Sequence, residues 1–277
     1  MEIKKRVAIL PNVVTAIGLS FGLFVIFKAV LPLEHGSVYR LLHTSALLLL
    51  ITALADFIDG AVARLVKGES EFGILFDSLA DAISFGVAPA ILVLRAVPLQ
   101  PRTPLSFFVV AGAMIFALCG ILRLVRFTVH TNPYRNELID DEVQKKNFTG
   151  LPIPAGAGVV VSLNLLLHSP IFLSVCPITL IQTAVILACT MTITGLLMVS
   201  RLRFPSLKTF HIRVRSVSLI LGAVIIALLL LYGILYFTPI LFTILAVGYV
   251  CTGLALSLIR FIAGKKTSVL QDYDMDD

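Results

Sequence analysis

Hydrophobic residues occur along this chain in long unbroken stretches and do not alternate with polar residues. A helix needs about 20 consecutive apolar residues to cross roughly 30 Å of hydrocarbon. Unbroken stretches favour helices over a transmembrane barrel, whose strands alternate in polarity. The pattern therefore predicts an all-α, polytopic membrane bundle. Eight stretches reach this length, near residues 11–32, 41–61, 73–97, 105–127, 152–174, 178–200, 216–236 and 238–261.

Composition agrees with this prediction, since 58% of the residues are hydrophobic and only 14% are charged. The longest polar stretch, about 128–150, is too short to bury the core of a soluble domain. The first apolar stretch is longer than the core of a signal peptide, so we expect it to be retained as a span. The four cysteines fall inside predicted spans at irregular spacing, which indicates packing rather than a disulfide framework.

The net charge of +6 reflects membrane topology. With eight spans, both termini lie on one side, and that side holds most of the 22 lysines and arginines. The positive-inside rule then places both termini in the cytoplasm, in a protein of the cytoplasmic (inner) membrane. The basic residues would also attract anionic head groups of membrane lipids. Nucleic acid is not indicated as a partner, and the acidic tail, 263–277, is expected to be cytoplasmic.

Four aspartates at membrane depth are the strongest chemical signal. Asp56 and Asp59 are three residues apart near the inner end of the second span, and Asp77 and Asp81 are four apart in the third. Each spacing places two side chains on one face of a helix. A short loop joins the two helices, so we expect them to pack antiparallel with all four carboxylates in one crevice at the cytoplasmic face.

Such a cluster repels itself unless cations neutralise it. Hard oxygen ligands suit Mg²⁺, Mn²⁺ or Ca²⁺, and the absence of soft ligands argues against a zinc–thiolate site. Metals held by carboxylates are suited to binding a diphosphate during phosphoryl transfer. We therefore expect one divalent cation or a pair of them at this site, with Mg²⁺ or Mn²⁺ as two ions the preferred interpretation.

Small residues accompany the aspartates. Gly60, Ala63 and Gly73 would let a nucleotide or phosphate approach the backbone, although helix packing explains small residues equally well. Arg64 could bind a phosphate oxygen or serve only as a positive-inside anchor.

The spacing of these residues resembles the CDP-alcohol phosphatidyltransferase family, whose signature is D-x2-D-G-x2-A-R-x8-G-x3-D-x3-D. The segment from Asp56 to Asp81 fills all eight defined positions. The resemblance implies a six-helix catalytic core over residues 7–200, which leaves an additional transmembrane hairpin at 216–262. It also allows a homodimer, although no residue of this sequence indicates one.

The resemblance implies roles for the matched residues. Asp56, Asp59 and Asp77 would bind metal and, with the glycines and the arginine, the CDP group. Asp81 would approach the metals and act as the base that deprotonates the acceptor alcohol, which is reasonable for a carboxylate beside a metal-bound diphosphate.

The segment after Asp81, AISFGVAPA, resembles the phosphatidylserine synthase branch of the family, as do 11–22, 148–158 and 198–206. This similarity implies transfer of a phosphatidyl group from CDP-diacylglycerol to L-serine, with release of CMP. Gly156 and Gly158 depart from the pattern, where alanines are expected. The alternatives are another acceptor (glycerol 3-phosphate or inositol phosphate) and, in a different class, a divalent-cation transporter.

A serine acceptor requires a cation for its carboxylate. Arg123 and Arg126, near the inner end of the fourth span, are candidates, as are Arg201 and Arg203, although any of them could instead hold lipid phosphate or extend to the interface. Two polar residues of the first span, Asn12 and Thr15, could contact the cytidine or its phosphates, and helix capping explains them equally well.

Overall fold

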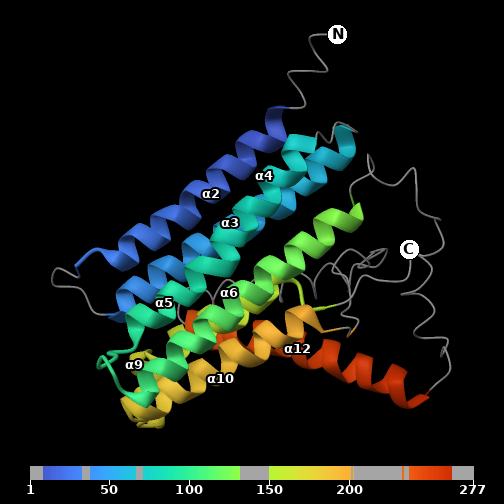
Figure 1. Ribbon diagram of the computed structural model, residues 1–277. Helices are drawn as coiled ribbons and strands as arrows, with labels where there is room; N and C mark the ends of the chain where they lie inside the picture. Colours follow the sequence, from blue (N-terminus) through green and yellow to red (C-terminus); the bar gives the residue numbers. More distant parts are fainter. Residues whose placement is uncertain are drawn as a thin grey trace, which may run out of the picture.

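The computed structural model describes residues 9–32, 38–66, 71–131, 150–200, 202, 233 and 237–263, and all regular structure in these ranges is helical (Figure 1). Six of the helices are long and apolar enough to cross a membrane, which confirms the predicted helical membrane protein. The elements are α2 (Ile9–Val30), α3 (Val38–Val66), α4 (Glu71–Asp81), the π-helix η1 (Ala82–Val87), α5 (Ala88–Ala96), α6 (Pro104–Thr131), α8 (Ile153–Leu167), α9 (Pro170–Val175), α10 (Leu180–Val199) and α12 (Thr238–Ala263).

The third expected span is one continuous rod that contains a wide turn. α4, η1 and α5 follow one another without a break, and the N–H of Ala88 donates to the carbonyl of Ile83, five residues earlier. Pro89 has no N–H to donate to the carbonyl of Phe85, and its ring would crowd that carbonyl in a regular α-helix. The π-helical turn begins directly after Asp81 and widens the backbone ahead of this proline.

The fifth expected span, 152–174, is two helices. α8 has 15 residues, about 22 Å at 1.5 Å per residue, and α9 begins a new direction after it. The break lies before Pro170, because a residue that precedes proline avoids the α conformation. Ser169 is extended there, and its hydroxyl accepts a hydrogen bond from the N–H of Phe172 at 3.2 Å. The seventh expected span, 216–236, lies outside the described residues except for Gly233.

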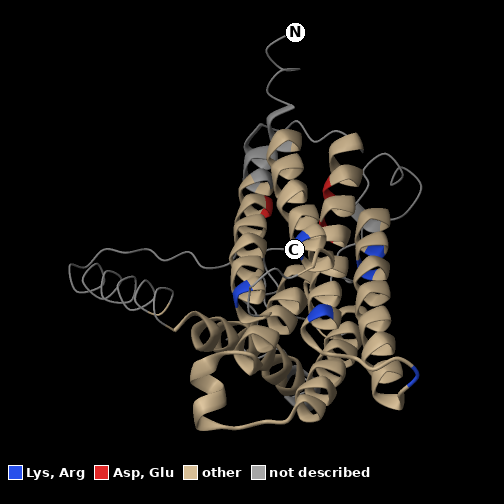
Figure 2. Ribbon diagram, turned by 90° about the vertical axis from the view of Figure 1, so that its left-hand side faces the viewer, with Lys and Arg blue, Asp and Glu red and all other residues tan. Residues whose placement is uncertain are grey.

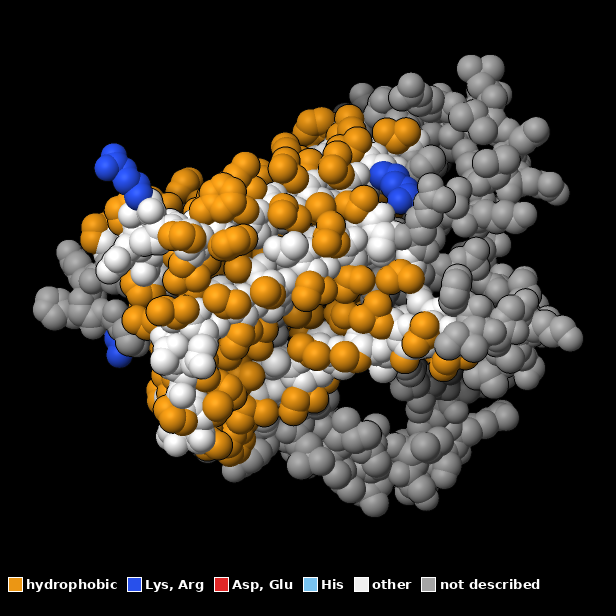
Figure 3. Space-filling view, turned by 60° about the horizontal axis from the view of Figure 1, so that its bottom comes forward, with side chains coloured by type: hydrophobic (Ala, Val, Ile, Leu, Met, Phe, Trp, Pro, Cys, Tyr) orange, Lys and Arg blue, Asp and Glu red, His pale blue; other side chains and the backbone are white. Residues whose placement is uncertain are grey.

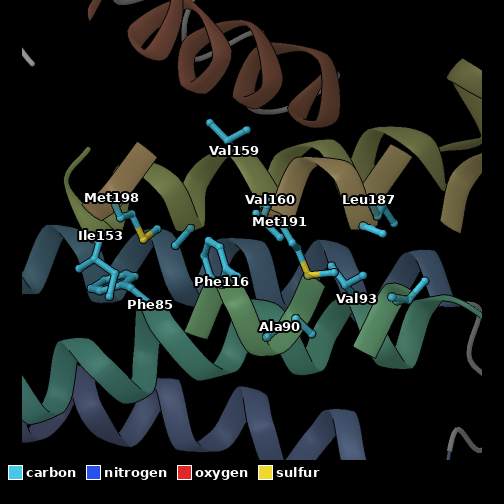
Figure 4. Packing of buried hydrophobic residues seen from close by; sticks show 14 of the residues in the cluster. Phe85, Ala90, Val93, Phe116, Ile153, Val159, Val160, Leu187, Met191 and Met198 are labelled. Carbon is cyan, nitrogen blue, oxygen red and sulfur yellow. The ribbon is translucent and has the colours of Figure 1, made fainter. Parts of the chain in front are cut away.

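The helices pack most extensively as three pairs: α2 with α3, α6 with α10, and α8 with α12. Phe116 of α6, Ile153 of α8 and Met191 and Met198 of α10 are essentially fully buried where α6, α8 and α10 meet (Figure 4). A second cluster joins α2, α3 and α5 to α8. The core therefore lies between helices, as expected for a bundle.

The seam between α8 and α10 explains one of the two unexpected glycines. A Cβ at Gly156 would collide with the terminal methyl of Met198, whereas a Cβ at Gly158 would make ordinary contact with Ala246, 3.8 Å away. The buried methionine thus occupies the space that an alanine at position 156 would need. Position 150 requires glycine for two reasons: its φ is +107°, and its Cα lies so close to the backbone of Met198 that a Cβ would collide.

The outer surface is apolar. Large hydrophobic side chains such as Phe107 (70% exposed) and Val175 (81%) point outward. Figure 3 shows one face covered by hydrophobic side chains, with a few basic side chains toward its edges. A soluble monomer rarely exposes so continuous an apolar surface. With the six long apolar helices, it identifies an integral membrane protein.

Candidate active site

Three carboxylates meet where α3 and α4 face each other. Asp56 belongs to α3, and Asp77 and Asp81 lie one turn apart on α4. One carboxylate oxygen from each lies within 4.8 Å of the others, and all three residues are half-buried. Figure 2 shows the acidic residues of the described helices at a similar level on separate helices. The i, i+4 spacing on α4 and the placing of α4 opposite α3 thus bring acids of two successive helices together.

The third wall of this crevice is α2. Among the described residues, α2 packs closely on both α3 and α4, while α3 and α4 make few direct contacts. The expected antiparallel pair is therefore a pair of helices separated by a crevice, with α2 beside both. A small cavity of about 10 Å³, the space of one water or ion, lies at the carboxylates. It is lined by Val14, Thr15, Gly18 and Leu19 of α2, Thr52 and Asp56 of α3, Asp77, Ala80 and Asp81 of α4, and Ser84 of η1.

Glycines allow α2 to approach this closely. At Gly18 a hydrogen bond of 3.4 Å runs from the Thr52 hydroxyl to the Gly18 carbonyl, which ties α2 to α3. One turn further, a Cβ at Gly22 would collide with the Ser84 side chain. Ser84 is 1% exposed, and its Oγ has no hydrogen-bond partner. These contacts hold Thr15, itself buried, beside the acids.

On its other side, α4 is tied to α6. The Ser78 and Thr128 hydroxyls are hydrogen-bonded at 2.8 Å. One to two turns back along α6 from Thr128 lies Arg123, whose Nε is buried without a hydrogen-bond partner. Asp81, Arg126 and Tyr249 of α12 act electrostatically on the Arg123 guanidinium. A desolvated cation therefore lies near the carboxylate that the sequence suggests as the base.

The carboxylates fit a hard divalent cation. Mg²⁺, Mn²⁺ and Ca²⁺ prefer oxygen ligands, and three carboxylate oxygens within 4.8 Å can converge on one ion. The adjoining cavity supplies further space for an ion or its water, lined by the hydroxyl-bearing Thr15 and Ser84. Because three negative charges gather at membrane depth, a bound divalent cation would remove most of their mutual repulsion.

The other residues singled out by sequence fall in different places. Gly60 and Gly73 are half-buried and, like Asn12, do not line the carboxylate cavity in the described part of the chain. The backbones of Asp59, Ala63 and Arg64 belong to α3, but their side chains lie outside the described residues, as do Arg201 and Arg203. Sequence reasoning missed Thr52, Ser84 and Tyr249. Two of them had local signals: Thr52 lies one turn before Asp56 on the same span, and Ser84 belongs to the SFG segment after Asp81.

Comparisons with known proteins indicate one family. A family model described as CDP-alcohol phosphatidyltransferase matches residues 8–197. The chain is 34% identical over 201 residues to the CDP-diacylglycerol–serine O-phosphatidyltransferase of Helicobacter pylori, an alignment covering 72% of each protein. It is 34% identical over 185 residues to the enzyme of that name from Methanocaldococcus jannaschii, covering 66% of this chain and 75% of the relative.

A third relative differs in the name of its lipid. The archaetidylserine synthase of Methanothermobacter thermautotrophicus is 36% identical over 159 residues, which is 56% of this chain and 58% of the relative. The names of all three relatives contain serine.

Proposed function

The chain belongs to the CDP-alcohol phosphatidyltransferase family, and from this premise we propose that it transfers the phosphatidyl group of CDP-diacylglycerol to L-serine, giving phosphatidylserine and CMP. The observation that carries the proposal is the convergence of Asp56, Asp77 and Asp81 beside Arg123. Carboxylates that bind divalent ions suit a diphosphate, and a half-buried guanidinium suits an acceptor that carries a carboxylate. The relatives named for serine support the same acceptor.

The metal ligands in this proposal are Asp56, Asp59, Asp77 and Asp81, which would hold Mg²⁺ or Mn²⁺ as two ions. When bound, the ions neutralise the diphosphate and the charge that develops on the departing CMP. Gly60, Ala63, Arg64 and Gly73 are assigned to the CDP group by the family signature. Thr15 lies in the lining of the carboxylate cavity and is the better placed of the two α2 candidates, since Asn12 is absent from that lining.

Asp81 is assigned the proton transfer. As the serine hydroxyl oxygen attacks the phosphorus that bears diacylglycerol, the hydroxyl proton passes to the Asp81 carboxylate. The bond between this phosphorus and the bridging diphosphate oxygen breaks, and CMP leaves. A general base of this kind typically contributes 10²–10⁴-fold to the rate.

Arg123 is assigned the serine carboxylate. The residue is half-buried and interacts electrostatically with Asp81, and its buried Nε–H has no hydrogen-bond partner. A charge-assisted hydrogen bond to a carboxylate would satisfy this group. Arg126 shares the inner end of α6 and adds positive charge nearby. Serine bound here would have its hydroxyl toward Asp81 and the diphosphate.

The proposed orientation follows the charge pattern of the sequence. We place both termini and the carboxylate crevice at the cytoplasmic face of the inner membrane, where serine can enter from the cytoplasm and CMP can leave. The catalytic core would comprise residues 7–200, followed by the hairpin 216–262 and the tail 263–277. α12 is the described helix of that hairpin.

An acceptor screen tests the proposal. Purified protein is incubated with CDP-dioleoylglycerol and Mn²⁺, with L-serine, glycerol 3-phosphate, inositol phosphate or no acceptor, and CMP is measured. Release that depends on serine and stops on chelation of the metal supports the proposal. A preference for a phosphorylated acceptor would keep the family chemistry and overturn serine, and background release with every acceptor would overturn the activity.

A further inference from the structure

A second hollow, far larger than the carboxylate cavity, begins at the same aspartate. This groove, the α3–α8–α12 groove, has a volume of about 610 Å³, within the usual range of ligand pockets. Its lining includes Leu50, Ala53 and Phe57 of α3 and Gly158 and Val161 of α8. The third wall of the groove is α12. Its lining is almost wholly apolar, apart from Asp56, Ser162 and Tyr249.

The groove and the candidate active site share one lining residue. Asp56 lines both the groove and the small cavity at the carboxylates. Tyr249, at the groove, acts electrostatically on Arg123. A molecule whose charged head group binds at the aspartates would therefore have its apolar portion beside the groove, where polar side chains are few.

One wall of the groove is α12, which follows the part of the chain matched by the family model. Phe242, Leu245, Ala246 and Tyr249 line the groove at spacings i, i+3, i+4 and i+7, so they form one helix face. Only 11% of the apolar stretch of α12 is buried inside the protein, so this helix packs on the rest of the bundle through a narrow face.

α12 is nevertheless fixed at a defined position on α8. The Thr243 hydroxyl donates to the Ser162 carbonyl at 3.1 Å, a contact between residues 81 positions apart. Beside it, Gly158 faces Ala246 closely enough that a Cβ would make van der Waals contact at 3.8 Å. A small residue on each helix thus allows α8 and α12 to approach closely at the groove.

The geometry points to α12 as the wall of an acyl-chain site: one fatty-acyl chain of the lipid substrate lies in the α3–α8–α12 groove, and the face of α12 selects that chain. This inference rests on the proposed function, because the lipid is held at Asp56 by its diphosphate. An acyl chain in a bilayer is already in an apolar medium, so selection arises from packing and shape, not from transfer out of water.

Filling the groove tests the inference. Ala246→Phe adds a ring where small residues of α8 and α12 line the groove. Ala255→Phe makes the same change at an exposed position of α12 that does not line the groove. In nanodiscs, CMP release is measured with CDP-dioleoylglycerol and with CDP-dioctanoylglycerol. Because the added ring would occupy space that the acyl chain fills, we expect Ala246→Phe to lower kcat/KM for the long-chain substrate roughly tenfold.

The short-chain substrate is the internal standard. Its kcat/KM should change less than twofold in Ala246→Phe, and Ala255→Phe should leave both substrates at wild-type values. Equal loss with both substrates, or no loss with either, would overturn the inference; the first result would mean that the groove holds a structural lipid or only packs the helix. Phe242→Ala, which widens the groove, gives an independent test: it should improve use of a bulky branched-chain CDP-diacylglycerol relative to the dioleoyl substrate, and an unchanged ratio would count against an acyl site.

Failure of the proposed function has a different signature. If wild-type protein releases no CMP with serine and either lipid, the reaction itself is wrong. If wild-type protein is active but the ratio of the two substrates is the same in every variant, only the acyl-chain site is wrong. Thermal unfolding of each variant in the same nanodiscs identifies any loss that comes from misfolding.

Discussion

Gly22→Ala should loosen the active site although residue 22 carries no side chain that could take part in chemistry. A Cβ there would collide with the Ser84 hydroxyl and lie 2.8 Å from the Ser84 Cβ and 3.0 Å from its Cα. The last of these is a backbone atom and cannot rotate away. α2 must therefore move from η1, and Thr15 moves with it relative to the aspartates.

The magnitude follows from a comparison with Gly18→Ala on the same helix. At Gly18 the nearest atom to an added Cβ is the Thr52 methyl at 3.6 Å, an ordinary contact. Both substitutions gain the same helix propensity, so that gain cancels in the comparison. What remains is overpacking at position 22, which we estimate at about 1–3 kcal/mol of unfolding free energy. Because a shift of 1 Å can cost about 100-fold in rate, activity should fall more steeply than stability.

The assay combines thermal unfolding in detergent with CMP release from CDP-diacylglycerol and serine. We expect Gly22→Ala to unfold several degrees below Gly18→Ala and to lose most activity. Gly248→Ala, at a glycine of α12 with no atom within 4 Å of an added Cβ, is the activity control. Adding Ser84→Gly to Gly22→Ala removes the two nearest colliding atoms and should restore part of both losses. Equal behaviour of the Gly18 and Gly22 variants would refute the close packing of α2 on η1.

Three further substitutions separate catalysis, acceptor binding and stability. Asp81→Asn should lower CMP release by 100-fold or more, while CDP-diacylglycerol still raises the unfolding temperature; full activity would remove Asp81 as the base. Arg123→Gln should raise the KM for serine about 10- to 100-fold, the value of a charge-assisted hydrogen bond of about 1.5–3 kcal/mol, with little change in the KM for the lipid. The reverse pattern would assign Arg123 to lipid phosphate. Asn164→Leu should stabilise the protein by about 1–3 kcal/mol in thermal unfolding, because both amide atoms of this fully buried residue lack partners. A lower unfolding temperature would show that the amide is satisfied in the membrane.

The helices could be predicted because continuous apolar stretches leave the backbone no other way to satisfy its hydrogen bonds in lipid. Their interruptions depend on single residues and were harder to predict. Pro170, which separates α8 from α9, was visible in the sequence but was outweighed by the length of the apolar stretch. The π-helix at Ala82–Val87 has two conditions, Pro89 and the tight packing of Ser84 on α2. The local sequence shows the proline but not the packing.

The aspartates could be predicted for a different reason. Their spacing within 26 residues encodes both their helix faces and their shared crevice, so Asp56, Asp77 and Asp81 meet as a local pattern suggests. Thr52 lies one turn before Asp56 on α3 and could have been found in the same way. Tyr249 reaches Arg123 through packing of a helix that is distant in sequence, and no periodicity within one segment specifies which residue of α12 does so.

The site combines three chemical regions. Three converging carboxylates lie near the half-buried Arg123, and one of them, Asp56, lines both the small cavity and the apolar groove. A divalent-cation transporter would need the acids but would give no reason for an apolar groove of about 610 Å³ that begins at one of them. A lipid-binding scaffold would need the groove but not three converging carboxylates at membrane depth. A substrate with an acyl chain and a diphosphate, attacked by a small acid-bearing alcohol, accounts for all three regions. On the same argument α12 belongs to the lipid-binding part of the proposed site, since four of its residues line the groove.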